Sequence, residues 1–474
     1  MAEIEWPTVA ELAEQVRRKD RSAVEVVDQA LAAIEGGNEA LNAFVVVDAD
    51  LARRTAAEVD AAVARGDDPG PLAGVPFGVK DLEDCAGLPT SHGSLLFKGG
   101  PPAEEDSVQV GRMRAAGAVP LGKTAAPEFG TLNFTKTKAW GITRNPWDPT
   151  RTPGGSSGGS AAAVGAGLVP IATASDGGGS TRIPAGFTGL VGLKATYGRI
   201  PRGPQLEIGN YTTTAGGLTR SVRDTARLFD VANGHDATDS FSLPRVEGWE
   251  SGLGTHADDL RGRRVAVAAD WGGAVVSPAM WEQLEEAAGH LIAEAGLARA
   301  DGVDTSLPRM GAAWSISGTV NLHNELGDRW PGCADDLTPE MRYAVEHTEG
   351  LYGTEARGRI EARRTALNDA MARLFEQVDL VISASNPDVA FAAEGPLPSS
   401  FGGIDEGAGN NGRLTFPANL HGCPAVSIPA GTLDGLPIGL QVIGPHFTEP
   451  LLLELALVME RTRPWPLVAP GAPS

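Results

Sequence analysis

The feature that most constrains this chain is a pair of glycine–serine runs lying close together in the sequence. Residues 154–160 read Gly-Gly-Ser-Ser-Gly-Gly-Ser, and residues 176–182 read Asp-Gly-Gly-Gly-Ser-Thr-Arg. Glycine has no Cβ, so such runs let backbone N–H groups turn towards a ligand or an incoming oxygen. A serine held in such a backbone can act as a nucleophile or as a proton relay. The two runs therefore indicate a functional site more strongly than any other part of the chain.

The apolar pattern predicts an α/β fold. Helices are expected where apolar residues recur with helical spacing, in residues 8–34, 51–64, 108–116, 160–165, 281–295 and 355–377. Strands are expected in residues 75–79, 118–121, 169–174, 264–268, 379–383, 425–429 and 438–443. This alternation favours a mixed, mostly buried central β-sheet covered by helices on both sides. Residues 235–262 are polar and irregular, and we expect them to form a surface loop.

Charge and composition narrow the class of protein. Hydrophobic residues make up 42% of the chain, which allows a sizeable core, and the net charge is −21. This charge argues against binding to nucleic acid or to an anionic membrane surface. The first residues lack a basic and apolar leader, and the longest apolar stretch, 161–174, is broken by glycine and proline. We therefore expect a soluble, cytoplasmic protein.

The cysteines, histidines and acidic pairs do not form a recognisable metal or disulfide pattern. Three cysteines (Cys85, Cys333 and Cys423) are scattered without a CxxC pair, and the eight histidines include no HExxH motif. The carboxylate pairs 104–105 and 335–336 lie in polar surroundings and are expected to face solvent. The sequence therefore predicts no metal and no cofactor.

Two motif matches suggest other functions. Residues 117–124 match the Walker A pattern, but the expected strand lies inside the match and Pro127 interrupts the helix that should follow. Residues 154–158 match G-x-S-x-G, the nucleophile elbow of α/β-hydrolases. Three prolines in residues 146–153 argue against the strand that an elbow needs before Ser156. The prolines weaken the nucleophile-elbow interpretation. They do not exclude it, because His421 and His446 follow in the sequence and could serve as the histidine that an elbow needs.

Lys80 is the third element of the candidate site. It ends the apolar strand 75–79, and the chain has only seven lysines, none beyond Lys194. A lysine acts as a general base only if its pKa is lowered towards neutrality by burial or by neighbouring cations. The simpler alternative is an ion pair with an acidic neighbour such as Asp81.

Residues 153–201 resemble the signature of the amidase signature family of serine hydrolases. The resemblance is carried by residues 154–160, 176–184 and 189–194. Further similarity lies in residues 74–81, 121–124, 417–419 and 435–441, so it spans most of the chain. It implies one amidase signature domain over 1–474, with an N-terminal helical segment (1–65), a catalytic core (74–200) and a variable, substrate-shaping region (235–415). It also explains the Walker A match as ordinary family sequence.

The resemblance assigns roles to three side chains. It implies that Ser180 is the nucleophile, that Ser156, which follows a cis peptide bond in the family, relays the proton, and that Lys80 is the base. The proton then passes from Ser180 to Ser156 to Lys80, and water hydrolyses the acyl-enzyme.

The resemblance also implies an oxyanion hole and a binding wall. The N–H groups expected to face the oxyanion are those of Gly177, Gly178 and Gly179, together with that of Ser180. Asp176 and Arg182 match positions that shape this loop. One departure from the family is Ala174-Ser175, where Gly-Thr is more common. The acyl pocket is expected at Phe129, Gly130 and Thr131, with Trp140 nearby.

The leaving-group side or a mobile lid is expected around Met310, Trp314, Ile316 and residues 402–412. The variable stretch offers apolar side chains, including Phe391 and Phe401, and no clear arginine–aspartate pair for gripping glutamine. These features favour an apolar, adjustable pocket.

The function implied is an amidohydrolase that cleaves the C–N bond of carboxylic amides. Its expected partners are small amides, esters, aryl carbamates (urethanes) or nylon-type oligomers, and the expected state is a monomer or homodimer. The alternative is the glutaminase subunit of a tRNA-dependent amidotransferase, which needs a partner protein. The intact Lys80, Ser156 and Ser180 argue against a third class, a binding-only pseudoenzyme.

Overall fold

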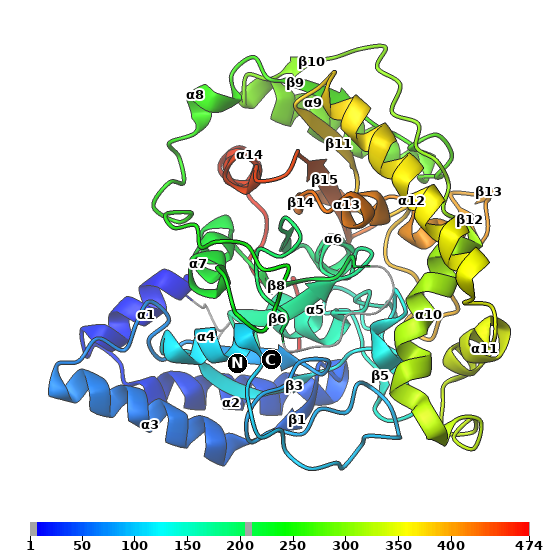
Figure 1. The fold of residues 1–474 in the computed structure, drawn as a ribbon. Coiled ribbons are helices and arrows are strands. Elements are labelled where there is room, and N and C mark those ends of the chain that lie inside the picture. Colours follow the sequence, from blue (N-terminus) through cyan, green and yellow to red (C-terminus); the bar gives the residue numbers. More distant parts are fainter. Residues whose placement is uncertain (1–6, 204–210, 474) are drawn as a thin grey trace.

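A mixed β-sheet of eleven strands runs through the molecule, and helices cover both of its sides (Figure 1). The computed structural model describes residues 7–203 and 211–473, and for residues 312–317 it describes the backbone only. The strand order is β1-β3-β2-β6-β8-β7-β14-β15-β11-β9-β10. The mixed sheet confirms the α/β class expected from the sequence.

The strands fall into two parallel groups joined by antiparallel neighbours. β3, β2 and β6 are parallel to one another, as are β11, β9 and β10, and the other adjacent pairs are antiparallel. The bounds are β1 Phe44–Val47, β2 Pro76–Lys80, β3 Val119–Thr124, β6 Ile171–Asp176, β7 Val191–Lys194, β8 Thr214–Thr219, β9 Arg264–Val267, β10 Ala298–Arg299, β11 Leu380–Ala384, β14 Ala425–Leu433 and β15 Leu436–Ile443. Two small hairpins lie outside the sheet, β4 Lys136–Thr137 with β5 Gly141–Ile142 and β12 Ser400–Phe401 with β13 Ile404–Asp405.

The helices lie between these strands along the chain, in places two or three in succession. Their bounds are α1 Val9–Arg17, α2 Ala23–Leu41, α3 Ala49–Arg65, α4 Val108–Ala115, α5 Gly158–Gly165, α6 Arg182–Thr188, α7 Val222–Ala232, α8 Ala257–Leu260, α9 Pro278–Glu294, α10 Ala312–Leu326, α11 Pro339–Thr348, α12 Thr354–Phe375, α13 Phe416–His421 and α14 Glu449–Thr462. Within the described ranges, no helix is both long enough and apolar enough to cross a membrane.

The periodic segment at 8–34 is two helices. α1 ends before Lys19, whose backbone has φ +63, and Ser22 then starts α2 with a capping box completed by Glu25. A left-handed residue cannot continue a helix, and a Ser-x-x-Glu box starts a new one. The uniform apolar spacing concealed this break, and α2 extends to Leu41.

The segment 235–262 is mostly irregular, as expected, but it is not entirely a surface loop. It contains α8, and Trp249 is buried and stacks on Phe229 of α7 with ring centroids 5.3 Å apart. Buried apolar side chains in a polar stretch, here Trp249 and Leu260, therefore anchor that stretch to the core.

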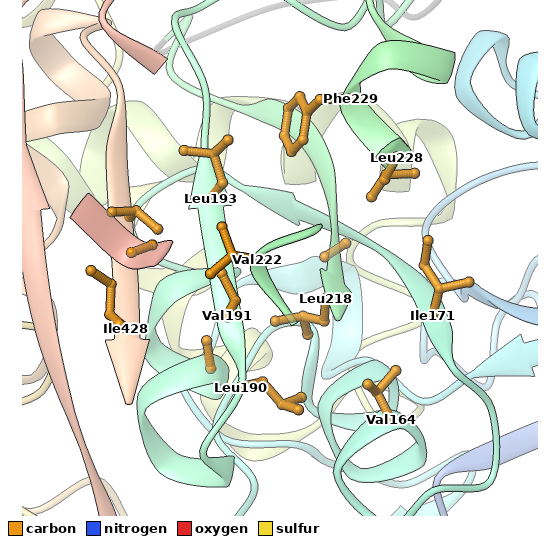
Figure 2. Packing of buried hydrophobic residues seen from close by; sticks show 14 of the residues in the cluster. Val164, Ile171, Leu190, Val191, Leu193, Leu218, Val222, Leu228, Phe229 and Ile428 are labelled. Carbon is orange, nitrogen blue, oxygen red and sulfur yellow. The ribbon is translucent and has the colours of Figure 1, made fainter. Parts of the chain in front are cut away.

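The core behind the site packs between β7, β8 and their helices. Figure 2 shows Leu193 of β7 and Leu218 of β8 beside Leu228 and Phe229, which come from α7. All four side chains are fully buried. This packing makes the sheet a fixed support for the loops at the ends of its strands.

Candidate active site

The sheet brings Lys80 and the second glycine–serine run to one edge. Lys80 is the last residue of β2, and Asp176 is the last residue of β6, which pairs with β2 in parallel. Because the carboxyl ends of parallel strands lie at the same edge, the lysine side chain and the loop that carries Ser180 meet there. The first run lies beside them, since the Ser157 N–H donates to the Ser180 carbonyl oxygen at 3.3 Å.

The glycines of the first run permit a close approach of backbones. A Cβ on Gly159 would lie 2.1 Å from the backbone nitrogen of Ala125, and one on Gly158 would lie 2.2 Å from the Thr135 hydroxyl. No side chain fits at such distances, so the start of α5 packs against Ala125, the residue after β3, only if residue 159 is glycine, and against Thr135 only if residue 158 is glycine. This packing sets the position of Ser156, just before the helix.

Lys80 lies inside a ring of serine hydroxyls. Its Nζ is 3.0 Å from Oγ of Ser156, 2.8 Å from Oγ of Ser157 and 3.0 Å from Oγ of Ser175. Its backbone N–H donates to the Thr173 hydroxyl at 2.9 Å, which ties the end of β2 to β6. The alternative of an ion pair with Asp81 does not occur, because the Asp81 carboxylate instead accepts from the N–H and hydroxyl of Ser91.

Burial makes Lys80 suitable as a proton acceptor. The side chain is fully buried, and the removal of water lowers the pKa of its amine from 10.5 to about 7. The carboxylates of Glu83 and Asp176 oppose this shift, and the Arg202 guanidinium adds to it. A substantial fraction of Lys80 is therefore neutral near pH 7, which a general base requires.

The second run is held by a buried ion pair between Asp176 and Arg182. Both side chains are essentially fully buried, and the guanidinium contacts the carboxylate through Nε and Nη2, at 3.0 Å each. Burial alone would raise the pKa of the Asp176 carboxyl, but the charge and hydrogen bonds of Arg182 hold that pKa well below its ordinary value. The loop is therefore closed around a permanent charge pair.

Segments far along the chain complete this network. Arg182 also donates to the Thr415 carbonyl at 2.9 Å, to Oε1 of Gln441 at 2.5 Å and to Oδ1 of Asn419 at 2.6 Å. Asn419 in turn donates to the backbone carbonyl and to the carboxylate of Asp176, each at 2.8 Å. A buried ion pair needs such additional hydrogen bonds to offset its loss of hydration.

The Asp176 carboxylate divides the N–H groups of the loop into two sets. The N–H groups of Gly179, Thr181 and Arg182 donate to it at 2.7, 3.3 and 3.4 Å. In the described part of the chain, the N–H groups of Gly177, Gly178 and Ser180 have no protein acceptor. Gly179, one of the four residues whose N–H groups are expected from the sequence to face the oxyanion, therefore already has a partner.

Gly179 has a different reason to be glycine. Its backbone has φ +127, and a Cβ there would lie 2.3 Å from the Thr415 hydroxyl. That hydroxyl donates to the Gly178 carbonyl at 2.6 Å, so it fixes the peptide between Gly178 and Gly179. The glycine shapes the loop by allowing this contact.

A cavity of about 940 Å³ opens onto these loops. Ser156, Ser175, Ser180, Gly177 and Gly178 line it, whereas Gly179 does not. One space is thus lined by two of the serines that contact Lys80, by the expected nucleophile and by the glycines whose N–H groups are unpartnered. This size is in the range of cavities that bind small molecules.

The expected binding wall is present only in part. Phe129, Gly130 and Thr131 line the cavity, and so do Met310 and several residues of the 402–412 segment. Trp140 does not line the cavity; its indole N–H instead donates to the Ser91 hydroxyl at 2.7 Å.

Other expected wall residues lie elsewhere. Phe391 packs against Phe134 and Phe187, and Phe401 is fully buried; neither borders the cavity. The side chains of Trp314 and Ile316 lie outside the described residues.

The competing motifs do not form the sites they would need. Residues 119–124 of the Walker A match are strand β3, and Lys123 is buried with its Nζ on the Glu83 carbonyl oxygen and the Thr90 hydroxyl. No strand precedes Ser156 in the described residues around it. His421 and His446 pair with each other, 3.0 Å from Nε2 of His446 to the His421 carbonyl, and neither borders the cavity. The three cysteines are buried and free.

Several residues that support the site were given no role by the sequence reasoning. Ser157, Thr415, Asn419 and Gln441 were not assigned roles, and Ser175 was noted only as a departure from the family. Asn419 and Gln441 lie within segments that resemble the family, which is the one signal that could have found them. Their contacts with Arg182 depend on chain crossings that local patterns do not encode.

Comparison with known proteins identifies the family of this chain. The family model described as Amidase matches residues 25–453. A curated relative from Lacticaseibacillus paracasei, named as a subunit of glutamyl-tRNA(Gln) amidotransferase, is 34% identical over 98% of both chains. Curated relatives of 33–36% identity from other bacteria carry the same name. The chain belongs to the amidase signature family.

Solved structures of this family share the fold. A bacterial aryl acylamidase of the amidase signature family superposes with a TM-score of 0.89, at 30% identity, covering 98% of this chain and 97% of the other. The corresponding glutamyl-tRNA(Gln) amidotransferase subunit from Thermotoga maritima superposes with a TM-score of 0.76, at 26% identity, covering 98% and 97%. The aryl acylamidase and the amidotransferase subunits therefore both match along nearly the whole chain.

Proposed function

We propose that this protein hydrolyses carboxylic amides through an acyl-enzyme on Ser180. The observation that carries this proposal is Lys80, a buried amine with a pKa of about 7, placed 3.0 Å from Ser156. Ser156 and Ser180 line the same cavity. The family also supports it, because its members include amide hydrolases such as the aryl acylamidase.

The chemistry follows from these positions. Neutral Lys80 accepts the proton of the Ser156 hydroxyl as Ser156 accepts that of Ser180, and Ser180 Oγ attacks the carbonyl carbon of the amide. The proton then returns through Ser156 to the leaving nitrogen, the C–N bond breaks, and an acyl-Ser180 ester remains. A water molecule then gives its proton to the same relay, Ser156 and Lys80, and its oxygen adds to the ester carbonyl. The ester bond breaks, the proton returns to Ser180 Oγ, and the carboxylic acid is released.

The unpartnered N–H groups supply the oxyanion hole in this scheme. Gly177, Gly178 and Ser180 offer donors at the cavity wall, and Gly179 is assigned a shaping role because its N–H is donated to Asp176. Losing one oxyanion donor typically costs about 3 kcal/mol of transition-state stabilisation.

Two substrate classes compete for this site. The names of the curated relatives favour the second candidate, a glutaminase subunit of an amidotransferase, over a stand-alone amidase. The fold match to the aryl acylamidase supports apolar amides, with esters and aryl carbamates as side substrates. One measurement separates the two candidate functions. It is the ratio of kcat/KM for glutamine to kcat/KM for aryl amides, determined with the chain alone and with candidate partner proteins.

The acyl-enzyme itself is tested by labelling. A fluorophosphonate should label Ser180, and Ser180→Ala should abolish both labelling and turnover, whereas Ser156→Ala should slow both and leave the label on Ser180. The exposed Ser251 offers a matched control, since Ser251→Ala should change neither. Full activity in Ser180→Ala, or a label on Ser156 in the native protein, would refute the assignment.

A further inference from the structure

Arg309 and Arg413 form a pair in the wall of the catalytic cavity, and the mechanism above uses neither of them. Arg309 lies just before α10, and Arg413 lies just before α13. Each guanidinium donates to the Gly273 carbonyl oxygen, and both distances are 3.0 Å. The two cations therefore lie next to each other at one place in the wall.

The loop between β9 and α9 is shaped around this pair. Its residue Gly273 has φ +144, and a Cβ there would lie 2.1 Å from Nη2 of Arg309. No side chain fits at that distance, so the guanidinium occupies this position only if residue 273 is glycine. The backbone of the loop thus provides a defined place for Arg309.

Among the described residues, a single carboxylate is paired with the two guanidiniums. Oε1 of Glu406 accepts from Nη1 of Arg309 at 3.4 Å and also from Nη1 of Arg413. Hydrogen bonding from Arg413 lowers the pKa of the Glu406 carboxyl, which is therefore ionised at neutral pH. Two cations and one anion leave one positive charge uncompensated in this part of the wall.

Part of each guanidinium is free to bind another group. In the part of the chain that the structure describes, Nε and Nη2 of Arg413 and Nε of Arg309 have no acceptor, and both of these Arg413 nitrogens keep accessible surface. The side chain of Arg309 is 57% exposed and that of Arg413 is 24% exposed. A guanidinium presents its donors in a planar fork that matches a carboxylate.

The loops that carry the pair are joined without it. The fully buried Asn410 accepts from the Val275 N–H at 2.9 Å and donates to the Val275 carbonyl oxygen at 2.8 Å. This reciprocal contact already connects the 402–412 segment to the loop before α9. A second arginine on the same carboxylate and the same carbonyl oxygen is therefore not needed to hold the loops together.

Arg413 is also connected to the loop that carries the nucleophile. Thr415, whose hydroxyl donates to the Gly178 carbonyl at 2.6 Å, lies two residues further on, a span of at most about 7 Å. The carboxylates that line the cavity belong to other elements, the loop after β2 and helices α10 and α11: Glu83, Asp84, Glu325 and Glu340. A negative group on a bound substrate is therefore attracted to the arginine pair.

We propose that Arg309 and Arg413 bind a carboxylate of the substrate, so that the preferred amides carry a negative charge away from the scissile bond. This inference rests on the proposed acyl-enzyme function and narrows its substrate class. The carboxylate belongs either to the acyl group, as in the monoamide of a dicarboxylic acid, or to the leaving amine, as in an N-acyl aminobenzoate. The recognition is the same in both cases, because either carboxylate accepts from the free guanidinium donors.

Matched substrates isolate the contribution of this charge. For the acyl group, the mono-4-nitroanilides of succinic, glutaric and adipic acid are each compared with an analogue that has a methyl ketone in place of the carboxylate. For the leaving amine, 4-acetamidobenzoate is compared with 4-acetamidoacetophenone. The ratio of kcat/KM for the charged member to kcat/KM for the neutral member reports recognition of the carboxylate in each pair.

The wild type should prefer the charged member in one of the two arms, which identifies the part of the substrate that carries the carboxylate. Arg309→Met and Arg413→Met should each lower that ratio about tenfold, the low end for a lost hydrogen bond to a charged group. Glu406→Gln removes the competing carboxylate and should raise the ratio about two- to fivefold, as expected for an exposed ion pair. The control is Arg299→Met, whose arginine pairs with Glu285 outside the cavity lining and should leave the ratio unchanged.

A wild type without preference for the charged member of any pair would overturn the proposal. Equal losses for charged and neutral substrates in both arginine variants would also overturn it, because the pair would then only support the loops. A lower ratio in Glu406→Gln would contradict it as well. Hydrolysis of the neutral amides that survives Ser180→Ala would instead count against the acyl-enzyme proposal, so the two failures can be told apart.

Discussion

The pH dependence of turnover offers a quantitative test of Lys80. If its amine is the base and its pKa is about 7, roughly half of the free enzyme is active at pH 7. The value of kcat/KM should then rise about tenfold per pH unit below pH 6 and level off above about pH 8. A lysine with its ordinary pKa of 10.5 would instead give a rise that continues to pH 10 or beyond.

The same shift has a consequence for stability that can be measured independently. A fall from 10.5 to about 7 corresponds to a cost on the order of 5 kcal/mol for keeping the buried amine charged. Because the folded pKa lies below the unfolded one, the unfolded chain binds more protons between these values, and the Lys80 contribution to stability increases as pH rises from 7 to 10.5. The difference in free energy of unfolding, wild type minus Lys80→Met, should therefore increase as the pH rises from about 7 to 10.5.

The assay is the pH profile of kcat/KM with 4-nitrophenyl acetate and one amide, corrected for spontaneous hydrolysis. Lys80→Arg should not restore activity lost in Lys80→Met, because a guanidinium stays protonated at these pH values. Lys138→Arg serves as the control, because Nζ of Lys138 donates to the Asp335 carbonyl and neither residue lines the cavity, so the profile should stay unchanged. A profile that keeps rising to pH 10, or high activity in Lys80→Arg, would refute the reasoning.

The loop that carries the nucleophile gives two further tests by urea unfolding and turnover. Arg182→Met leaves the Asp176 carboxylate buried without its cation and should cost about 3–5 kcal/mol of stability. The control is Arg53→Met at a half-exposed ion pair, which should cost less than about 1 kcal/mol. Equal losses in the two variants would contradict the importance of burial. Gly179→Ala meets both a left-handed backbone and a threonine hydroxyl 2.3 Å from the new Cβ, so we expect a loss of at least about 2 kcal/mol together with a fall in kcat. Gly431→Ala has a similar φ, +122, and open space around it, so it should show only the backbone penalty of about 1 kcal/mol, and a loss as large as that of Gly179→Ala would argue against the steric part.

Local patterns in the sequence were sufficient for most of the elements that support the site. The strand that ends at Lys80 and the strand expected at 169–174 are short apolar runs; both form, the second as Ile171–Asp176. The glycine–serine runs also marked the loops correctly, because a run of glycines has few uses other than close approach or unusual backbone angles. These signals are local, so one stretch of sequence contains them entirely.

Elements whose stability comes from their neighbours were missed. β8 reads Thr-Ala-Gly-Gly-Leu-Thr and has little strand propensity of its own, yet it pairs with β6 on one side and β7 on the other. At Gly217 a Cβ would lie 2.3 Å from a methyl group of Leu228 in α7, so tight packing against a helix explains that glycine. Strand propensity depends strongly on such packing, and a sequence pattern does not include it.

The sequence by itself determined which groups could do chemistry: two serines in glycine loops and a lysine at the end of an apolar strand. Only the tertiary structure decided how they work together. The pKa of Lys80 depends on burial by the whole sheet, and the division of N–H groups between Asp176 and the cavity depends on a loop closed by Arg182. That loop is locked by Asn419 and Gln441, more than 230 residues further along the chain. Desolvation and long-range hydrogen bonding arise from contacts between distant segments, and for that reason no local pattern could specify them.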